Sequence, residues 1–144
     1  MTDCVFCAIV RGERSAHTVF EDGLCLAILD HRPLFPGHCL LLPKPHHATL
    51  ADLPGDLLGP LFAGAQLLAK AVEGALEAEG TFVAINNRVS QSVPHLHVHV
   101  VPRRRRDGLR GFFWPRQAYE GEEHRRRVTE RLREAVSRLR TPDR

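Results

Sequence analysis

The sequence lacks any apolar run close to the ~20 residues that a membrane-spanning helix needs. Its first ten residues also lack the basic start and long apolar stretch of a signal peptide. We therefore expect no transmembrane helix, no secretion and a cytoplasmic location. Cysteine is scarce, with four in the chain. In a cytoplasmic protein we expect these to be thiols or metal ligands rather than disulfides.

No internal repeat, low-complexity stretch or linker divides the 144 residues. At roughly 150 residues per domain this length predicts one domain, 1–144, large enough to bury about two-thirds of its unfolded surface. Hydrophobic residues are 43% and charged residues 26% of the chain, which is ordinary globular usage and argues against disorder.

Positive charge is concentrated at the end of the chain. Residues 101–144 hold 14 of the 20 basic and 7 of the 17 acidic residues, so this part sums to +7 and residues 1–100 sum to −4. The basic segment, about 103–144, suggests an anionic partner such as a phosphate-bearing small molecule, RNA or an acidic protein face. The simpler interpretation of the run Arg125–Arg127 is the solvated face of a surface helix.

Short strand-like segments outnumber helical ones. A hairpin is predicted over 18–30, with its turn at 21–23, and further strands over 38–43, 81–86 and 95–101. Helical periodicity covers about 54–79, with the regular helix starting near Gly59 and Pro60 and Gly80 as its cap, and again about 120–140. The pattern predicts an α+β domain with a mainly antiparallel sheet, one long helix and a C-terminal helix.

Three histidines, His95, His97 and His99, alternate with aliphatic residues near the last predicted strand. On a strand this places the imidazoles on one face, ~6.6 Å apart, and the aliphatic side chains on the other, buried face. Such a row could ligate a metal or supply a nucleophile whose neighbours set its protonation. The spacing alone leaves these two alternatives open.

The segment QSVPHLHVHVVPR resembles the signature of the histidine triad family. The stretch AILDHRPLFPGHCLLLPKPHHATLADL resembles that family's other characteristic region, so the resemblance covers most of residues 4–103. It implies the histidine triad fold. It also implies a nucleotide hydrolase or nucleotidyl transferase that cleaves at the α-phosphate of a phosphoramidate or dinucleoside polyphosphate, through a nucleotidyl-histidine intermediate.

The resemblance also implies roles for individual residues. His97 matches the nucleophile, His99 the histidine that contacts the phosphate and manages the leaving group's proton, and His38 the histidine that completes the polar cluster. Substrate contacts fall on four further positions: Asp30 for the ribose hydroxyls, Asn86 as a nearby amide, and Gln91 and Ser92 for the phosphate. A neutral imidazole is a competent nucleophile near pH 7, which agrees with these assignments.

Cys4 and Cys7 form a Cys-x-x-Cys pair, which alone could indicate a redox pair, a metal site or coincidence. Family members with this pair complete a structural zinc site with two histidines. The matching positions here are His46 and His95, with His47 as the neighbouring alternative to His46. Cys25 and Cys39 lie within apolar strands and are predicted to be core residues.

The segment DGLRGFFWPRQAY resembles one bacterial branch of the family. Within it, Trp114 is either a lid over the nucleobase or a core anchor for the C-terminal helix. The family resemblance implies a homodimer that binds a nucleotide substrate, with no membrane partner and at most non-specific binding of nucleic acid. Two alternatives stay open: a nucleotide- or RNA-binding module with little activity, and a zinc-dependent hydrolase that uses the histidine row as ligands.

Overall fold

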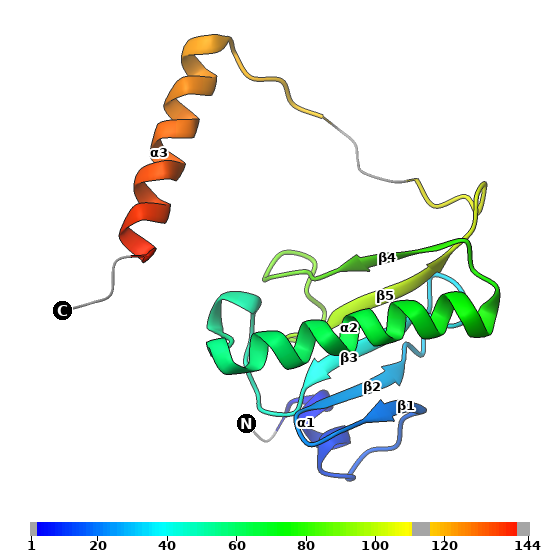
Figure 1. Ribbon diagram of the computed structural model, residues 1–144. Helices are drawn as coiled ribbons and strands as arrows, with labels where there is room; N and C mark the ends of the chain where they lie inside the picture. The colour runs from blue at the N-terminus through cyan, green and yellow to red at the C-terminus, as the bar shows by residue number, and fades with distance from the viewer. Residues whose placement is uncertain (1–2, 111–115, 141–144) are drawn as a thin grey trace. The chain divides into compact units, whose positions relative to one another are not determined.

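The computed structural model describes residues 3–110 and 116–140, which fall into two compact units divided between Asp107 and Gly108. The first unit holds a five-stranded sheet (Figure 1). Its strands are β1 (Thr18–Glu21), β2 (Cys25–Leu29), β3 (Cys39–Pro43), β4 (Gly80–Ala84) and β5 (Val98–Arg103). They lie in the order β1-β2-β3-β5-β4, and every neighbouring pair is antiparallel. The predicted α+β class and antiparallel sheet are confirmed.

The predicted hairpin is also confirmed, because β1 and β2 pair directly around the turn at Asp22. The Asp22 carboxylate accepts hydrogen bonds from the backbone N–H groups of Leu24 and Cys25, both at 2.8 Å. A carboxylate that accepts hydrogen bonds from two backbone N–H groups in this way stabilises the turn.

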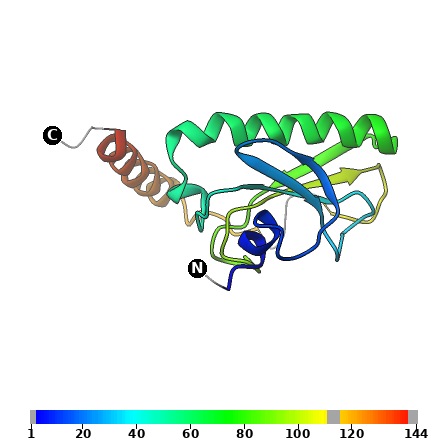
Figure 2. The same cartoon turned by 90° about the horizontal axis from the view of Figure 1, so that it is seen from below.

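Helices cover the two faces of the sheet, as Figure 2 shows. The long helix α2 (Gly55–Leu76) packs on one face, and the short helix α1 (Val5–Val10) lies on the other. A single 3₁₀ turn, Leu50–Asp52, precedes α2. The core under α2 includes Leu41, Leu61, Leu68, Leu96, Val98 and Val100. The core under α1 consists of Phe6, Leu26, Ile28, Leu40 and Leu42.

The boundaries of α2 differ from the prediction. The helix begins at Gly55, so Pro60 lies inside it rather than in its first turn. A proline there removes one backbone hydrogen bond, but Leu57 and Leu61 on either side are buried and hold the first turns against the sheet. Glu77, not Gly80, caps the other end with a left-handed backbone (φ 54°), while Gly80 opens β4. Arg104 donates to the Leu76 carbonyl there and supports this end.

The strand that carries the histidines is shorter than predicted, because β5 begins at Val98 and its ladder with β3 starts at the pair Leu41 and Val98. His95 and His97 therefore precede the regular strand. The side chains before Val98 still alternate between the two faces of the sheet, because Leu96 is fully buried under α2. The N–H of Leu96 donates to the carbonyl of His47 at 2.7 Å.

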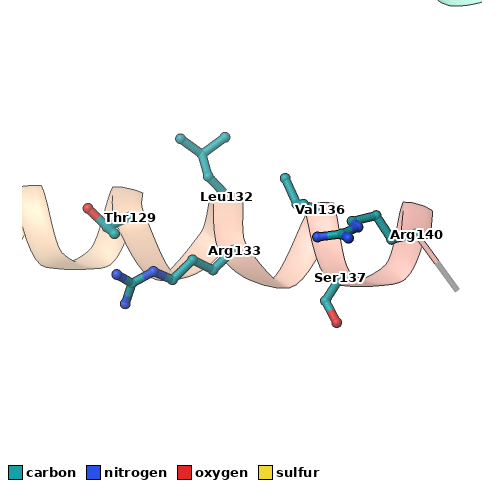
Figure 3. A pocket seen from close by; sticks show the side chains of 6 residues that line it. All are labelled: Thr129, Leu132, Arg133, Val136, Ser137 and Arg140. Carbon is teal, nitrogen blue, oxygen red and sulfur yellow. The ribbon is translucent and has the colours of Figure 1, made fainter.

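The second unit contains α3 (Glu122–Arg140), close to the predicted range. A hollow along it is lined only by residues of this helix, and Figure 3 shows Leu132 and Val136 on the same side. Arg126 pairs with Glu123 and Glu130, as expected for the solvated helix face predicted from the arginine run. No helix in the described parts of the chain is long and apolar enough to span a membrane.

Candidate active site and metal site

A cavity of about 650 Å³ lies on the face of the sheet that α1 covers. Most of its exposed surface is apolar, and polar side chains are interspersed among the apolar ones. The lining consists of Val5, Phe6, Ile9, Arg14–His17, Ile28–His31, Leu40, Ser92, Val93, His97 and His99. Cavities of this size and composition are typical of sites for small organic ligands.

His97 lines this cavity and is only 4% exposed. Its Nδ1 lies 2.8 Å from the backbone carbonyl oxygen of His95. A carbonyl can only accept, so Nδ1 carries the proton and donates it. The lone pair of the neutral ring is therefore on Nε2, the nitrogen that a nucleophilic histidine would use.

A chain of hydrogen bonds fixes the proton positions of the two histidines beside His97. The N–H of Leu34 donates to Nδ1 of His38 at 3.1 Å, so the proton of neutral His38 is on Nε2. That Nε2 lies 2.9 Å from Nδ1 of His99 and donates to it. His99 consequently keeps its own proton on Nε2, as a hydrogen-bond donor. Asp30 approaches the chain, with its carboxylate 3.6 Å from Nε2 of His38.

Both histidines are held neutral by their surroundings. Burial lowers the pKa of His38, partly opposed by Asp30. Burial and the neighbouring His97 and His38 lower the pKa of His99 to about 4. Near neutral pH the hydrogen-bond chain therefore stays in the arrangement described above.

This pKa predicts a pH dependence of stability. The folded pKa of His99 is about 4 and its ordinary value is 6.5, so between these pH values the unfolded chain binds more protons. The free energy of unfolding should therefore fall as the pH falls from 6.5 to 4. Urea unfolding at pH 7, 6 and 5 measures this, and His99→Gln should show a shallower dependence. An unchanged dependence in the variant would contradict the assigned pKa.

A second cluster, beside the cavity, brings together the predicted metal ligands Cys4, Cys7, His46 and His95. The distance from Cys7 Sγ to His46 Nδ1 is 3.3 Å, from Cys7 Sγ to His95 Nδ1 3.6 Å, and from Cys4 Sγ to His95 Nδ1 3.5 Å. Four N and S ligands around a tetrahedral zinc lie about 3.3–3.8 Å apart, given its bond lengths. These side chains are therefore already spaced for one zinc ion.

The protonation state of the cluster also suits a metal. His95 Nε2 lies 2.8 Å from the carbonyl oxygen of Pro43 and donates to it, which leaves the lone pair of Nδ1 for the metal. Burial and the adjacent Cys4 raise the pKa of the Cys7 thiol, so a thiolate there needs a cation beside it. Of the two adjacent histidines, His46 is the one in the cluster, and the backbone carbonyl of His47 accepts from the N–H of Leu96.

The triad histidines do not converge on a single metal position. Among the described residues, two groups of side chains could hold a metal ion: the cluster of Cys4, Cys7, His46 and His95, and a set made of Asp30, His38 and His99. His97 belongs to neither group. In that second set, His38 and His99 already share a hydrogen bond through the two facing nitrogens. This division disfavours a catalytic metal bound by the histidine row.

A HIT domain family model matches residues 11–106, two-thirds of the chain. The chain belongs to the HIT family. Among curated HIT relatives, a HIT-like protein of Mycobacterium tuberculosis is 45% identical over 108 residues, which span 74% of this chain and 75% of that protein.

Two other relatives carry functional names. An adenylylsulfatase of Arabidopsis thaliana is 38% identical over 109 residues, spanning 74% of this chain and 55% of that protein. An adenosine 5′-monophosphoramidase of Candida albicans is 32% identical over 121 residues, spanning 80% of each chain.

Solved structures of HIT proteins have the same fold. A member from Bacillus subtilis superimposes with a TM-score of 0.84 at 28% identity, covering 99% of both chains. A zinc-bound histidine triad protein from Mycobacterium smegmatis has a TM-score of 0.72 at 39% identity, covering 94% of this chain and 97% of that one. The predicted histidine triad fold and family are confirmed.

The predicted substrate residues of this HIT chain have different surroundings. Asp30 and Ser92 line the cavity. Gln91 is engaged elsewhere, because its amide donates to the Ala48 carbonyl and accepts from the Arg88 N–H. Asn86 is exposed and is not among the lining residues. Trp114 lies outside the described residues, and its role stays a prediction.

Sequence reasoning missed one wall of the cavity. Three residues of α1, Val5, Phe6 and Ile9, face it, as does the segment 14–17 that follows the helix. The available signal was the apolar run VFCAIV, which begins directly after Cys4. Long-range contacts bring this run next to the triad: Cys4 and Cys7 lie against the ring of His95, and Phe6 packs against His97.

Proposed function

We propose that this HIT protein hydrolyses nucleotide conjugates at the α-phosphate, with His97 as the nucleophile. The observation that carries the proposal is the hydrogen bond from His97 Nδ1 to the His95 carbonyl, which leaves Nε2 free in a cavity of nucleotide size. The names of the Arabidopsis and Candida relatives support adenylyl conjugates, a phosphosulfate and a phosphoramidate, as the substrate class.

The proposed reaction has two steps. In the first, Nε2 of His97 forms a bond to the α-phosphorus, and the bond from phosphorus to the leaving group breaks with its electron pair on the leaving group. The leaving group takes up a proton from solvent. In the second, water attacks the phosphorus, the N–P bond breaks and returns its electrons to Nε2, and the proton of the water is released. The products are a nucleoside monophosphate and the free leaving group.

The neighbours of His97 stabilise this transfer with hydrogen-bond donors and acceptors that are already in place. Nε2–H of His99 is oriented by His38, so it can donate to a phosphoryl oxygen or to the leaving-group atom without reorganisation. Ser92 lines the same cavity and offers a hydroxyl to the phosphate. The carboxylate of Asp30, which also lines the cavity, offers acceptors for the ribose hydroxyls.

We propose that the Cys4–Cys7–His46–His95 cluster holds structural zinc. Bound zinc supplies a rigid cross-link there, and four protein ligands leave no open coordination position for substrate. The residues themselves join α1 to the ends of β3 and β5. A homodimer, which the family resemblance suggests, and a cytoplasmic location complete the proposal.

A substrate panel tests the proposed activity. Adenosine 5′-phosphoramidate, adenylyl sulfate and diadenosine tetraphosphate are each incubated with the protein, and AMP release is followed by chromatography. We expect multiple-turnover release of AMP from at least one conjugate. Binding of all three without AMP release would favour the alternative of a nucleotide-binding module.

A further inference from the structure

We propose that Phe6 is a positioning residue for the His97 nucleophile, and that the cluster of Cys4, Cys7, His46 and His95 holds Phe6 against His97. This inference rests on the proposed function of His97. It concerns the contacts of Phe6 with His95 and His97, which link the four-residue cluster to the cavity.

The ring of Phe6 contacts two of the triad histidines. Its centroid lies 5.1 Å from that of His97 with the planes at 78°, and 5.8 Å from that of His95 with the planes at 82°. Edge-to-face geometry of this kind is favoured between aromatic rings and is sensitive to ring orientation. Phe6 is 5% exposed and belongs to the buried apolar cluster on this face of the sheet, so its ring has little freedom to move.

Three contacts together fix the His97 ring. The hydrogen bond to the His95 carbonyl holds Nδ1, Phe6 packs against the ring from α1, and His99 contacts it from β5 at 5.0 Å between centroids. A hydrogen bond at one nitrogen leaves the ring free to tilt, so the packing contacts decide where Nε2 points. Displacement at phosphorus needs the attacking nitrogen in line with the leaving group, and small errors in such alignment are costly.

The cluster holds both groups that orient His97. Phe6 lies between the two cysteine ligands in α1, with Cys4 as the N-cap of the helix. His95 offers its ring to the cluster and its carbonyl to His97. A six-residue helix is too short to be stable by itself, so the cross-link and the burial of Phe6 determine where α1 lies. The cluster therefore acts on the nucleophile through Phe6 and through the His95 carbonyl.

The test compares two variants of the zinc-loaded protein, Phe6→Leu and Leu26→Val. Leu26 belongs to the same apolar cluster but does not line the cavity, so its variant is a control for weakened packing. The readouts are kcat and KM for adenosine 5′-phosphoramidate, the melting temperature, and the imidazole ¹⁵N NMR shifts of His97. These shifts report which ring nitrogen carries the proton.

We expect Phe6→Leu to lower kcat roughly 10- to 100-fold and to change KM less than about threefold. A ring that is free to tilt also spends part of its time without the Nδ1 bond to the His95 carbonyl, so the single His97 tautomer signal should become an average of two. Leu26→Val should lower the melting temperature and leave kcat and the tautomer unchanged. The inference is overturned if Phe6→Leu keeps kcat and the tautomer, if it changes KM alone, or if Leu26→Val reproduces its effects.

Metal removal tests the second part of the inference. Wild-type protein stripped with a chelator, or Cys4→Ala if stripping unfolds the chain, should show the same averaging of the His97 tautomer signal. An unchanged signal would show that the cluster does not orient His97. If wild-type protein shows no turnover of any nucleotide conjugate, the proposed function fails, while the NMR comparison still decides the positioning role of Phe6.

Discussion

Replacing His97 with glutamine should lower kcat for adenosine 5′-phosphoramidate by roughly 10⁴-fold or more, the size of effect seen when a covalent nucleophile is removed. Glutamine keeps a donor in place of the buried imidazole but offers no nucleophilic nitrogen. The fold and nucleotide affinity should persist, because the cavity walls are otherwise unchanged. Steady-state kinetics and a melting curve on His97→Gln measure these quantities.

His124→Gln is the matched control for this prediction. His124 lies on α3, outside the residues that line the cavity, so its variant should keep wild-type kcat. A His97→Gln protein with near wild-type kcat would show that His97 does not attack the phosphorus. An unfolded His97→Gln protein would contradict the expectation that the fold tolerates the change.

Loss of a metal ligand should have the largest effect on stability. Zinc that binds only the folded state, at a free concentration a thousandfold above its Kd, stabilises a protein by about 4 kcal/mol. For a chain of this size that corresponds to roughly 12 °C in melting temperature. We therefore expect Cys7→Ala to lose its bound zinc, measured by elemental analysis, and to melt about 12 °C lower than wild type in excess zinc.

Cys39→Ala is the control for this second prediction. Cys39 is a buried core cysteine, 3% exposed, and lies outside the ligand cluster. Its variant should retain about one zinc per chain and lose only the stability expected for a small core truncation. Wild-type protein purified without chelators that contains no metal would contradict the zinc site itself.

The local elements could be predicted wherever a residue pattern has one physical interpretation. Alternation of period two predicted that Leu96, Val98 and Val100 are buried together, and they are. The turn at Asp22 was predicted from its Glu-Asp-Gly sequence, because few other residues close a hairpin so well. In contrast, the ends of α2 predicted from Pro60 and Gly80 are wrong. The burial of Leu57 and Leu61 starts the helix before Pro60, and the left-handed backbone of Glu77 ends it before Gly80.

The site could be predicted only in part. His97, His99 and His38 meet as the family resemblance implied, and His46 joins the cluster rather than His47. Spacing could not show that Phe6 contacts His97, because the two are 91 positions apart and meet only when α1 docks on the sheet. Nor could it show that Gln91 uses its amide to bind the backbone of a neighbouring loop.

The most direct test of the covalent mechanism is a rapid chemical quench of the wild-type protein during turnover of adenosine 5′-phosphoramidate, followed by intact-mass analysis and peptide mapping. The mechanism predicts a transient mass increase of one adenylyl group, located on His97 and absent from His97→Gln. Rapid turnover with no adduct at any quench time, or an adduct on a residue other than His97, would contradict it.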